Sequence, residues 1–242
     1  MKKPDTPNNI PRIIHQLWSG EEKPLPEDLK ILSETWKEYH PDWSYELWDN
    51  NRINSFIKQY YPNYWNIYSR FPYNVQRWNA VRYLILDKMG GMYIDVDYKS
   101  LSPIDDLIEN KTYCFAEKTE SHCKVFKRTI NQVFNNAMML SIPEHPFIRK
   151  VIKTVFREET LRYNASKELC VYNTTGPWML IDLYCDLTEE GKEEIYLIPS
   201  QYVTPFDVSQ AHRAIKGVES EELEQCLENT YALHYFWGGW RQ

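Results

Sequence analysis

The 242-residue sequence has no C-x-x-C motif, and its five cysteines are an odd number. Neither a disulfide framework nor a zinc site is therefore predicted. It also has no run of 18 apolar residues, so we expect no membrane-spanning helix. Because the first seven residues lack the apolar stretch of a secretory signal, we expect a reducing, cytoplasmic location. Peripheral contact with a membrane stays open.

Positive charge is not in excess either, since the formal net charge is −6. An acidic chain repels phosphates, so no nucleic-acid partner is expected. The sequence shows no glycine-rich phosphate loop followed by lysine, no internal repeat and no low-complexity linker. With 43% hydrophobic residues it can bury a sizeable core, and we expect a single domain over residues 1–242.

The most informative stretch covers residues 77–98. Apolar residues in its first part recur at helical spacing, which predicts a helix over 78–89. Gly90 and Gly91 follow, and glycine ends a helix without backbone strain. Residues 92–98 are rich in β-favouring types, so a short strand is expected there.

Two carboxylates, Asp95 and Asp97, lie at the end of this predicted strand. Side chains two residues apart on a strand point to the same face, and open α/β sheets bind ligands at the carboxyl ends of their strands. Adjacent carboxylates repel each other unless a cation lies between them, and oxygen ligands suit Mg²⁺ or Mn²⁺ holding a diphosphate. Because an Asp-x-Asp pair also arises by chance, the pair alone does not establish a metal site.

Asn79 and Arg82 are one turn apart on the predicted helix and therefore share a face. Apolar residues surround Arg82 in the sequence, and a guanidinium in such company needs an anionic partner. That partner is either a ligand phosphate or a structural carboxylate, and the sequence leaves both open.

The string Asn-Ala-Val-Arg-Tyr of residues 79–83, followed by Gly-Gly-Met-Tyr-Ile-Asp-Val-Asp of residues 90–97, resembles the core motif of glycosyltransferase family 32. The resemblance extends from Ile10 to about Trp240. It implies an α/β fold of the GT-A type, Rossmann-like, with a mostly parallel or mixed central sheet flanked by helices. It also implies retaining transfer of a hexose from a UDP- or GDP-sugar to a carbohydrate acceptor, with Mn²⁺ or Mg²⁺ as cofactor. A role in surface or capsular polysaccharide synthesis is the corresponding expectation.

The resemblance also implies roles for individual residues. Asp97 would coordinate the metal, Asp95 would contact the ribose or the water shell of the metal, and Arg82 would stabilise the leaving diphosphate; these three are the expected catalytic residues. The expected substrate-binding residues are Trp18, Asn79, Arg82, Gly91, Thr175, His234, Trp237 and Trp240, and His234 is an expected metal ligand together with Asp95 and Asp97. Trp18, Thr175 and His234 fit structural roles equally well.

The chain departs from the family pattern at two places. Trp78-Asn79 stands where many members carry Ser-Asp, and Gly239 stands where many carry Ser. Asn79 still hydrogen-bonds but brings no charge, so the contacts to the donor sugar are the least determined part of the expected site.

Outside the central stretch, the patterns predict strands over 10–18, 44–48, 112–117, 196–199 and 202–206, and helices over 26–39, 50–60, 63–71, 103–108 and 144–160. Asp49 is expected to cap the helix that follows it. Pro177 is expected at the first position of a helix capped by Thr174 or Thr175. Residues 122–134 are β-prone without a firm assignment, and 207–228 are expected to form surface loop and helix. Residues 231–242 are too aromatic to lie free in water.

Two other functions remain in view. A metal-dependent nucleotidyltransferase or sugar-phosphate hydrolase would use the same carboxylate pair on a phosphoryl group, but such enzymes often carry the glycine-rich loop that is missing here. A non-catalytic carbohydrate-binding protein would use the aromatic residues, which are 15% of the chain, without needing paired carboxylates.

Overall fold

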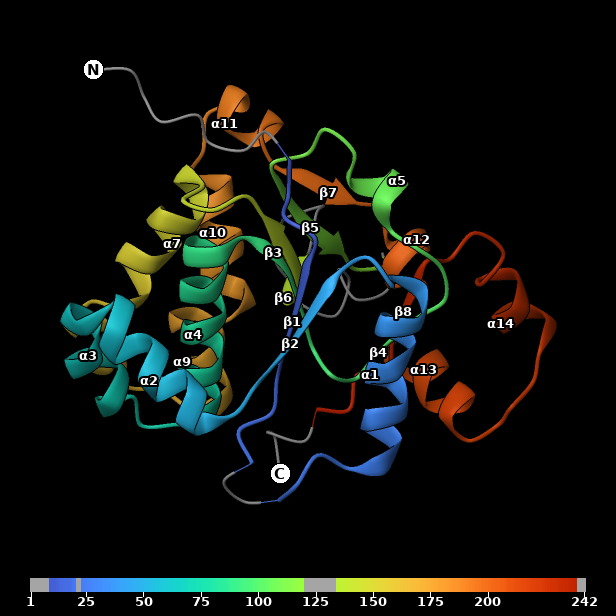
Figure 1. Cartoon of the computed structure of the whole chain (residues 1–242), viewed down its shortest axis with the longest axis horizontal. Helices are drawn as coiled ribbons and strands as arrows, with labels where there is room; N and C mark the ends of the chain where they lie inside the picture. Colours follow the sequence, from blue (N-terminus) through green and yellow to red (C-terminus); the bar gives the residue numbers. More distant parts are fainter. Residues whose placement is uncertain (1–8, 21–22, 120–133, 239–242) are drawn as a thin grey trace.

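The computed structural model describes residues 9–20, 23–119 and 134–238. A six-stranded sheet in the order β2–β1–β3–β6–β5–β7 forms its centre (Figure 1). The strands of this sheet are β1 Ile13–Leu17, β2 Ser44–Trp48, β3 Gly91–Ile94, β5 Tyr113–Glu117, β6 Phe134–Ser141 and β7 Tyr196–Ile198. A second sheet pairs β4, Tyr98–Ser100, with β8, Ala232–His234.

The large sheet is mixed. Strand β1 runs parallel to β2 and to β3, and β5 runs parallel to β7. Strand β6 lies antiparallel to both β3 and β5. The expectation of an α/β fold with a mostly parallel or mixed sheet is therefore confirmed, and β6, which the sequence patterns did not assign, is the strand that makes it mixed.

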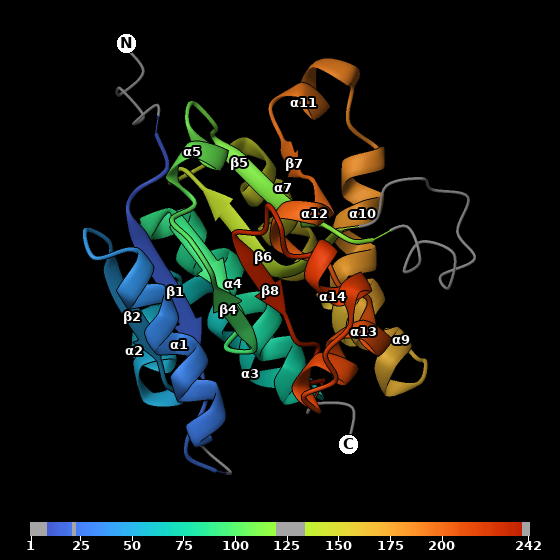
Figure 2. The ribbon, with the colours of Figure 1, turned by 90° about the vertical axis from the view of Figure 1, so that its right-hand side faces the viewer.

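Helices cover both faces of this sheet (Figures 1 and 2). One core lies under α2, α3, α4, α7 and α10, and a second lies under α1, α5, α12 and the β4–β8 pair. The helices are α1 Glu27–Tyr39, α2 Asn50–Tyr60, α3 Trp65–Arg70, α4 Asn74–Met89, α5 Asp105–Ile108, α7 Pro146–Val155, α8 Glu158–Leu161, α9 Lys167–Thr174, α10 Pro177–Cys185, α11 Glu189–Glu193, α12 Ser200–Val203, α13 Val208–Ile215 and α14 Glu221–Gln225, with a 3-10 turn at Pro62–Tyr64. No helix within the described ranges combines the length and apolarity needed to traverse a bilayer.

Strand β3 contributes to both cores because its side chains alternate. Met92 and Ile94 face the core under α1, whereas Tyr93 faces the core under α4. All four residues of the strand are buried, as expected for a strand covered on both faces. The end of β3 is therefore held firmly between two layers.

The two glycines before β3 have backbone angles that favour glycine. Gly90 has a φ of 65° and Gly91 a φ of 91°. A Cβ on Gly91 would lie 2.5 Å from the carbonyl oxygen of Ile13 on the neighbouring strand. The predicted helix end is confirmed, and glycine also permits the close approach of β1 to β3.

Several predicted elements are confirmed, and three need correction. Helix α1, strand β2 and helix α2 occupy the expected residues, and Asp49 accepts a hydrogen bond from the amide of Arg52 as a cap. The predicted strand over 202–206 is wrong, because α12 forms there, with the amide of Thr204 bonded to the carbonyl of Ser200.

The other two corrections concern long predicted elements. The helix expected over 144–160 is interrupted at Phe156, whose φ of −94° and ψ of 49° end α7 before α8 begins. The strand expected over 92–98 ends at Ile94, and its last residues belong to a turn and to β4.

The C-terminal segment is part of the fold. Strand β8 pairs antiparallel with β4 (Figure 2). In this pairing His234 lies opposite Tyr98. Leu233 packs with residues of α13 and α14 in a small separate cluster. The expectation that the aromatic tail packs against the protein is confirmed as far as residue 236, whereas Trp237 is exposed. Residues 239–242 lie outside the described part.

Candidate functional site

The predicted carboxylate pair lies in a turn between the two sheets. The amide of Asp95 still donates to the carbonyl of Ala137 on β6, at 2.7 Å. The chain then turns, with the amide of Tyr98 bonded to the carbonyl of Asp95 at 3.2 Å, and continues as β4. The expectation that Asp95 and Asp97 share one face of a regular strand is wrong, because pairing with β8 draws the chain away from the large sheet.

Arg82 on α4 holds Asp95 in place. Its Nη1 lies 3.2 Å from Oδ1 of Asp95 and donates to the carbonyl of Asn136 at 2.7 Å. Its Nε donates to the carbonyl of Trp78, and the guanidinium lies 4.3 Å from the ring centre of Tyr93. The anionic partner that the sequence required is thus the protein carboxylate, one of the two alternatives left open.

The carboxylate of Asp95 remains accessible although Arg82 is buried. The Tyr93 hydroxyl donates to the same Oδ1 at 2.7 Å, yet the Asp95 side chain is 32% exposed. Burial raises the pKa of Asp95, and the charge of Asp97 adds to this, while Arg82 acts in the opposite direction. Burial raises the pKa of Tyr93 well above its ordinary range, so its hydroxyl stays protonated as a donor.

Asp97 is held by the C-terminal segment. Its Oδ2 lies 3.3 Å from Nε2 of His234 and accepts a hydrogen bond from the amide of Trp237 at 2.8 Å. Burial acts to raise the pKa of Asp97, but His234 and the Trp237 amide outweigh it, so the pKa is lowered. The other oxygen, Oδ1, is buried without a hydrogen-bond partner in the described residues. One oxygen is therefore satisfied by the protein and one is available to a ligand.

His234 is packed between two aromatic rings. Its ring stacks on Tyr98 with centres 4.2 Å apart and contacts Phe236 at 4.0 Å. Within the described ranges, no three His, Cys, Asp or Glu side chains are grouped as a metal site. The predicted shell of Asp95, Asp97 and His234 is therefore not formed as three converging ligands, because the Nε2 atom of His234 faces Asp97 itself.

Asn79 and Thr175 belong to a buried hydrogen-bond network. Nδ2 of Asn136 donates to Oδ1 of Asn79 at 3.0 Å, and Nδ2 of Asn79 donates to Oγ1 of Thr175 at 3.4 Å. The Tyr83 hydroxyl donates to the Thr175 carbonyl at 2.7 Å. Thr175 is fully buried and is not accessible for the expected substrate contact. Its hydrogen bonds instead help to join α4, α9 and β6.

The cap predicted before Pro177 also differs. Pro177 is the first residue of α10, as expected, but the N-cap is Gly176 and makes no side-chain hydrogen bond. Thr174 is the last residue of α9, and Thr175 is its C-cap. The two threonines therefore finish one helix instead of starting the next.

The other expected binding residues, Trp18, Gly91, Trp237 and Trp240, differ in where they lie relative to Asp95 and Asp97. Trp18 follows β1. Its neighbour Gln16, two residues earlier, donates from its side chain to the carbonyl of Asp95. The partly buried indole of Trp18 itself donates to the carbonyl of Lys23. Gly91 begins β3 at the end remote from Asp95, against Ile13, so its part is structural. Trp237 adjoins Asp97 and is 49% exposed; Trp240 lies outside the described residues.

Three residues of the site were missed in the sequence. Tyr93 could have been predicted from the sequence, since it precedes Asp95 by two positions on a strand and so points to the same face. Asn136 could not have been predicted, because its carbonyl on β6 accepts a hydrogen bond from Arg82, which is 54 positions away in the sequence. Tyr98, which stacks on His234, is likewise placed by pairing between distant segments.

Comparisons with known proteins agree with this geometry. The family described as "Glycosyltransferase sugar-binding region containing DXD motif" matches residues 26–114. An inositol phosphoceramide mannosyltransferase of Schizosaccharomyces pombe is 28% identical over 81% of this chain and 58% of its own length. A mannosyl phosphorylinositol ceramide synthase of Saccharomyces cerevisiae is 31% identical over 81% of this chain and 49% of its own length. The chain thus spans about half the length of these curated relatives.

Two solved structures share the fold. The PaToxG glycosyltransferase superimposes with a TM-score of 0.53 at 15% identity, covering 90% of this chain and 78% of its own. The ligand-free glycosyltransferase domain of the YGT toxin gives a TM-score of 0.54 at 9% identity, covering 91% and 88%. The architecture is accordingly that of the GT-A glycosyltransferases.

One relative matches over most of both chains. An uncharacterized glycosyltransferase of Acanthamoeba polyphaga mimivirus is 30% identical over 82% of this chain and 74% of its own length. The match to the family model, over residues 26–114, includes the carboxylate turn, and the description of that family names the DXD motif. On these grounds the chain belongs to glycosyltransferase family 32.

Proposed function

We propose that this chain transfers a hexose from a UDP- or GDP-sugar to a hydroxyl of a carbohydrate or glycolipid acceptor. The observation that carries the proposal is the turn between β3 and β4, where two carboxylates are fixed by opposite parts of the chain. Arg82 and Tyr93 hold Asp95, and the C-terminal segment holds Asp97. Both fungal relatives described above are named for mannosyl compounds or mannosyl transfer, so mannose is the first donor sugar to test.

The residues at the turn fit a divalent cation. Oδ1 of Asp97 is a buried carboxylate oxygen without a partner among the described residues, and the Asp95 side chain is partly open to solvent. Hard oxygen ligands of this kind suit Mg²⁺ or Mn²⁺. Asp97 would hold the cation directly and Asp95 would contact it or its water shell. Such a cation, when bound, neutralises charge on the diphosphate.

The protein residues around the pair have distinct parts in the proposal. Arg82 is buried with its donors on Asp95 and two carbonyls, so we assign it to positioning the carboxylate and supplying positive potential. The backbone amide of Trp237 bonds to Asp97 and its side chain is exposed; an aromatic face suits the apolar side of a sugar ring, so we assign Trp237 to the sugar. Retention at the anomeric carbon, polysaccharide synthesis and a cytoplasmic location rest on the sequence argument and stay predictions.

The proposal is tested by replacing Asp97 with Asn, which preserves shape and removes charge. With GDP-mannose, UDP-glucose and UDP-galactose supplied with Mn²⁺, transfer of labelled hexose should fall about 100-fold or more, as losses of transition-state charge stabilisation usually do. Asp186→Asn, at the exposed end of α10, is the matched control and should transfer at the original rate.

Product analysis decides between the alternatives. Undiminished transfer by Asp97→Asn, with the protein folded, would contradict the proposed role of the pair. Release of free sugar phosphate without glycoside would favour a hydrolase. Binding of sugars without turnover of any donor would favour a carbohydrate-binding protein.

A further inference from the structure

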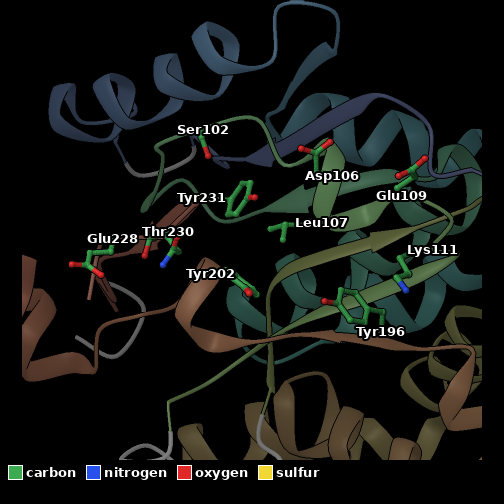
Figure 3. Close-up of a pocket in the computed structure, with 11 residues that line it drawn as sticks. Ser102, Asp106, Leu107, Glu109, Lys111, Tyr196, Tyr202, Glu228, Thr230 and Tyr231 are labelled. Atoms are coloured by element: carbon green, nitrogen blue, oxygen red, sulfur yellow. The ribbon is translucent and has the colours of Figure 1, made fainter. Parts of the chain in front are cut away.

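A cavity of about 930 Å³ lies away from the carboxylate turn (Figure 3). It is bounded by α5 and the residues beside it, by β7 and α12, and by the turn that precedes β8. Neither Asp95 nor Asp97 lines it. Its volume is that of a pocket for an extended small ligand, since such pockets span roughly 300–1,000 Å³.

Tyrosine rings form the apolar part of this cavity. Tyr196 from β7, Tyr202 from α12 and Tyr231 from the turn before β8 all line it; Figure 3 shows Tyr231 near the middle of the lining residues and Tyr196 beside Lys111. The rings of Tyr202 and Tyr231 are nearly perpendicular, with centres 6.0 Å apart. All three side chains are half-buried, so part of each ring remains open to a ligand.

Hydrogen-bonding groups surround these rings. Asp106, Glu109, Glu228 and Asn229 line the cavity and are exposed. In the described part of the chain, none of these four side chains makes a hydrogen bond or ion pair that would use up its oxygens. The cation beside them, Lys111, lies 4.5 Å from the ring centre of Tyr196.

The combination of rings and carboxylates selects a class of ligand. Three carboxylates against one ammonium repel phosphates and other anions, so a nucleotide is disfavoured here. Dense polar groups disfavour an apolar peptide. A neutral oligosaccharide satisfies both features, because the C–H faces of its rings pack on aromatics and its hydroxyls donate to carboxylate and amide oxygens.

We propose that this cavity binds a neutral oligosaccharide and holds the part of a glycan acceptor remote from the reacting hydroxyl. Strands β4 and β8 connect the two places: Tyr98 and His234 are at the end near Asp97, and Ser102 and Tyr231 are at the cavity end. The four residue steps from Tyr98 to Ser102 span about 13 Å along the chain, so a ligand that reaches both places must be longer than a monosaccharide. The acceptor part of this inference rests on the proposed function.

The experiment measures binding without donor, so that it does not depend on turnover. Mannotetraose, maltotetraose and cellotetraose are titrated calorimetrically into the wild-type chain and four variants. For the tetrasaccharide that binds, Tyr202→Ala should weaken affinity about tenfold through loss of ring packing, and Tyr202→Phe should stay within about twofold. Glu109→Ala, at an exposed position, should also weaken binding. This second effect cannot come from disturbed packing of α12, because Glu109 lies outside that helix.

Tyr163→Ala is the matched control, because Tyr163 is 43% exposed and does not line the cavity. Its affinity should equal that of the wild type. The inference is overturned if no tetrasaccharide binds, or if Tyr202→Ala and Glu109→Ala bind as tightly as Tyr163→Ala while all three melt as folded proteins.

Transfer assays separate this inference from the proposed function. With an active donor, Tyr202→Ala should raise KM for the tetrasaccharide acceptor. It should leave unchanged the transfer to the methyl glycoside of the corresponding monosaccharide, which is too short to reach the cavity. Tetrasaccharide binding that depends on Tyr202 and Glu109, without any transfer, would support the binding site and refute the proposed function. Transfer with unchanged KM in both variants would refute the acceptor role alone.

Discussion

Arg82 illustrates how one side chain links two layers at the residue scale. It is 6% exposed and bonds to Asp95 on one side and to the backbone of β6 on the other. A buried guanidinium is stable only when such partners satisfy it. The same contacts that stabilise the fold therefore fix the position of a proposed ligand-binding carboxylate.

Replacing Arg82 with Leu should affect both stability and ligand binding. Breaking a buried ion pair costs several kcal/mol, but Asp95 is partly exposed and regains water, so we expect a loss of about 2 kcal/mol in the free energy of unfolding. Nucleotide binding with Mn²⁺ should weaken as well, because Asp95 loses its restraint. Urea unfolding and calorimetry measure the two effects.

Arg82→Lys is the control for charge, since it keeps a cation without the planar fork of donors. It should recover part of the stability but less of the binding. If Arg82→Leu lowers the melting temperature and binds nucleotide as the wild type does, Arg82 is a purely structural residue.

His15 provides a test of pH dependence. The indole of Trp48 donates to its Nδ1 at 3.2 Å, so its Nε2 carries the proton and donates to the carbonyl of Gly90 at 3.0 Å. Burial lowers the pKa of His15 from 6.5 to about 4. The unfolded chain therefore takes up a proton below pH 6.5, while the folded chain does so only near pH 4.

The free energy of unfolding should consequently fall as the pH is lowered from about 6.5 to about 4. At pH 5 the contribution of His15 to this loss is about 2 kcal/mol. His15→Gln should make the fall between pH 7 and pH 5 shallower, and His212→Gln, at an exposed position, should leave it unchanged. Identical slopes in urea unfolding for wild type and His15→Gln would contradict the burial argument.

At the scale of elements, the junction of α4 and β3 sets the position of the carboxylate turn. Gly91 lets β3 approach β1 closely, and Ile14 and His15 pair with Met92 and Tyr93. The junction must be compact because both strands lie in the centre of the sheet. A side chain at Gly91 would push β3 away and shift Asp95 with it.

Gly91→Ala should therefore destabilise the protein more than its backbone angle alone requires. A positive φ costs a non-glycine residue about 1–2 kcal/mol, and the contact with the Ile13 carbonyl adds to this. Gly217→Ala is the matched control, because Gly217 has a φ of 71° and nothing within 4 Å of the added Cβ. Thermal melts should show the larger loss for Gly91→Ala; equal losses would mean that crowding has no effect.

At the scale of the whole molecule, the site joins the two sheets. Asp95 is attached to the large sheet through Ala137, and Asp97 is attached to the small sheet through the segment after β8. A ligand that contacts both carboxylates therefore ties the C-terminal segment to the central core. Such a ligand stabilises the folded chain by mass action.

A nucleotide sugar with Mn²⁺ should accordingly raise the melting temperature. At one hundred times its dissociation constant, a ligand adds about 2.7 kcal/mol, which corresponds to roughly 5–10 °C for a chain of this size. Asp97→Asn should lose most of this shift. A thermal shift screen of UDP- and GDP-sugars, with and without Mn²⁺, measures it and identifies the donor; a shift that persists in Asp97→Asn would place the nucleotide elsewhere.

Elements that local interactions fix can be predicted from the amino-acid sequence alone. The helical period before Gly90, the cap at Asp49 and the family motif at residues 79–97 lie within a few turns of chain. Short-range backbone geometry and side-chain capping act over such distances. The fold class and the carboxylate pair followed from them.

The assembly of the site, in contrast, depends on contacts between distant segments of the folded chain. Strand β6 reads Phe-Asn-Asn-Ala-Met-Met-Leu-Ser, and its Ala, Met and Leu residues favour a helix, yet pairing with β3 and β5 makes it a strand. Through that pairing Asn136 reaches Arg82, and through β4 and β8 His234 reaches Asp97. The physical reason is that these contacts join segments more than fifty residues apart, whose meeting depends on the burial of the whole core and not on any local pattern.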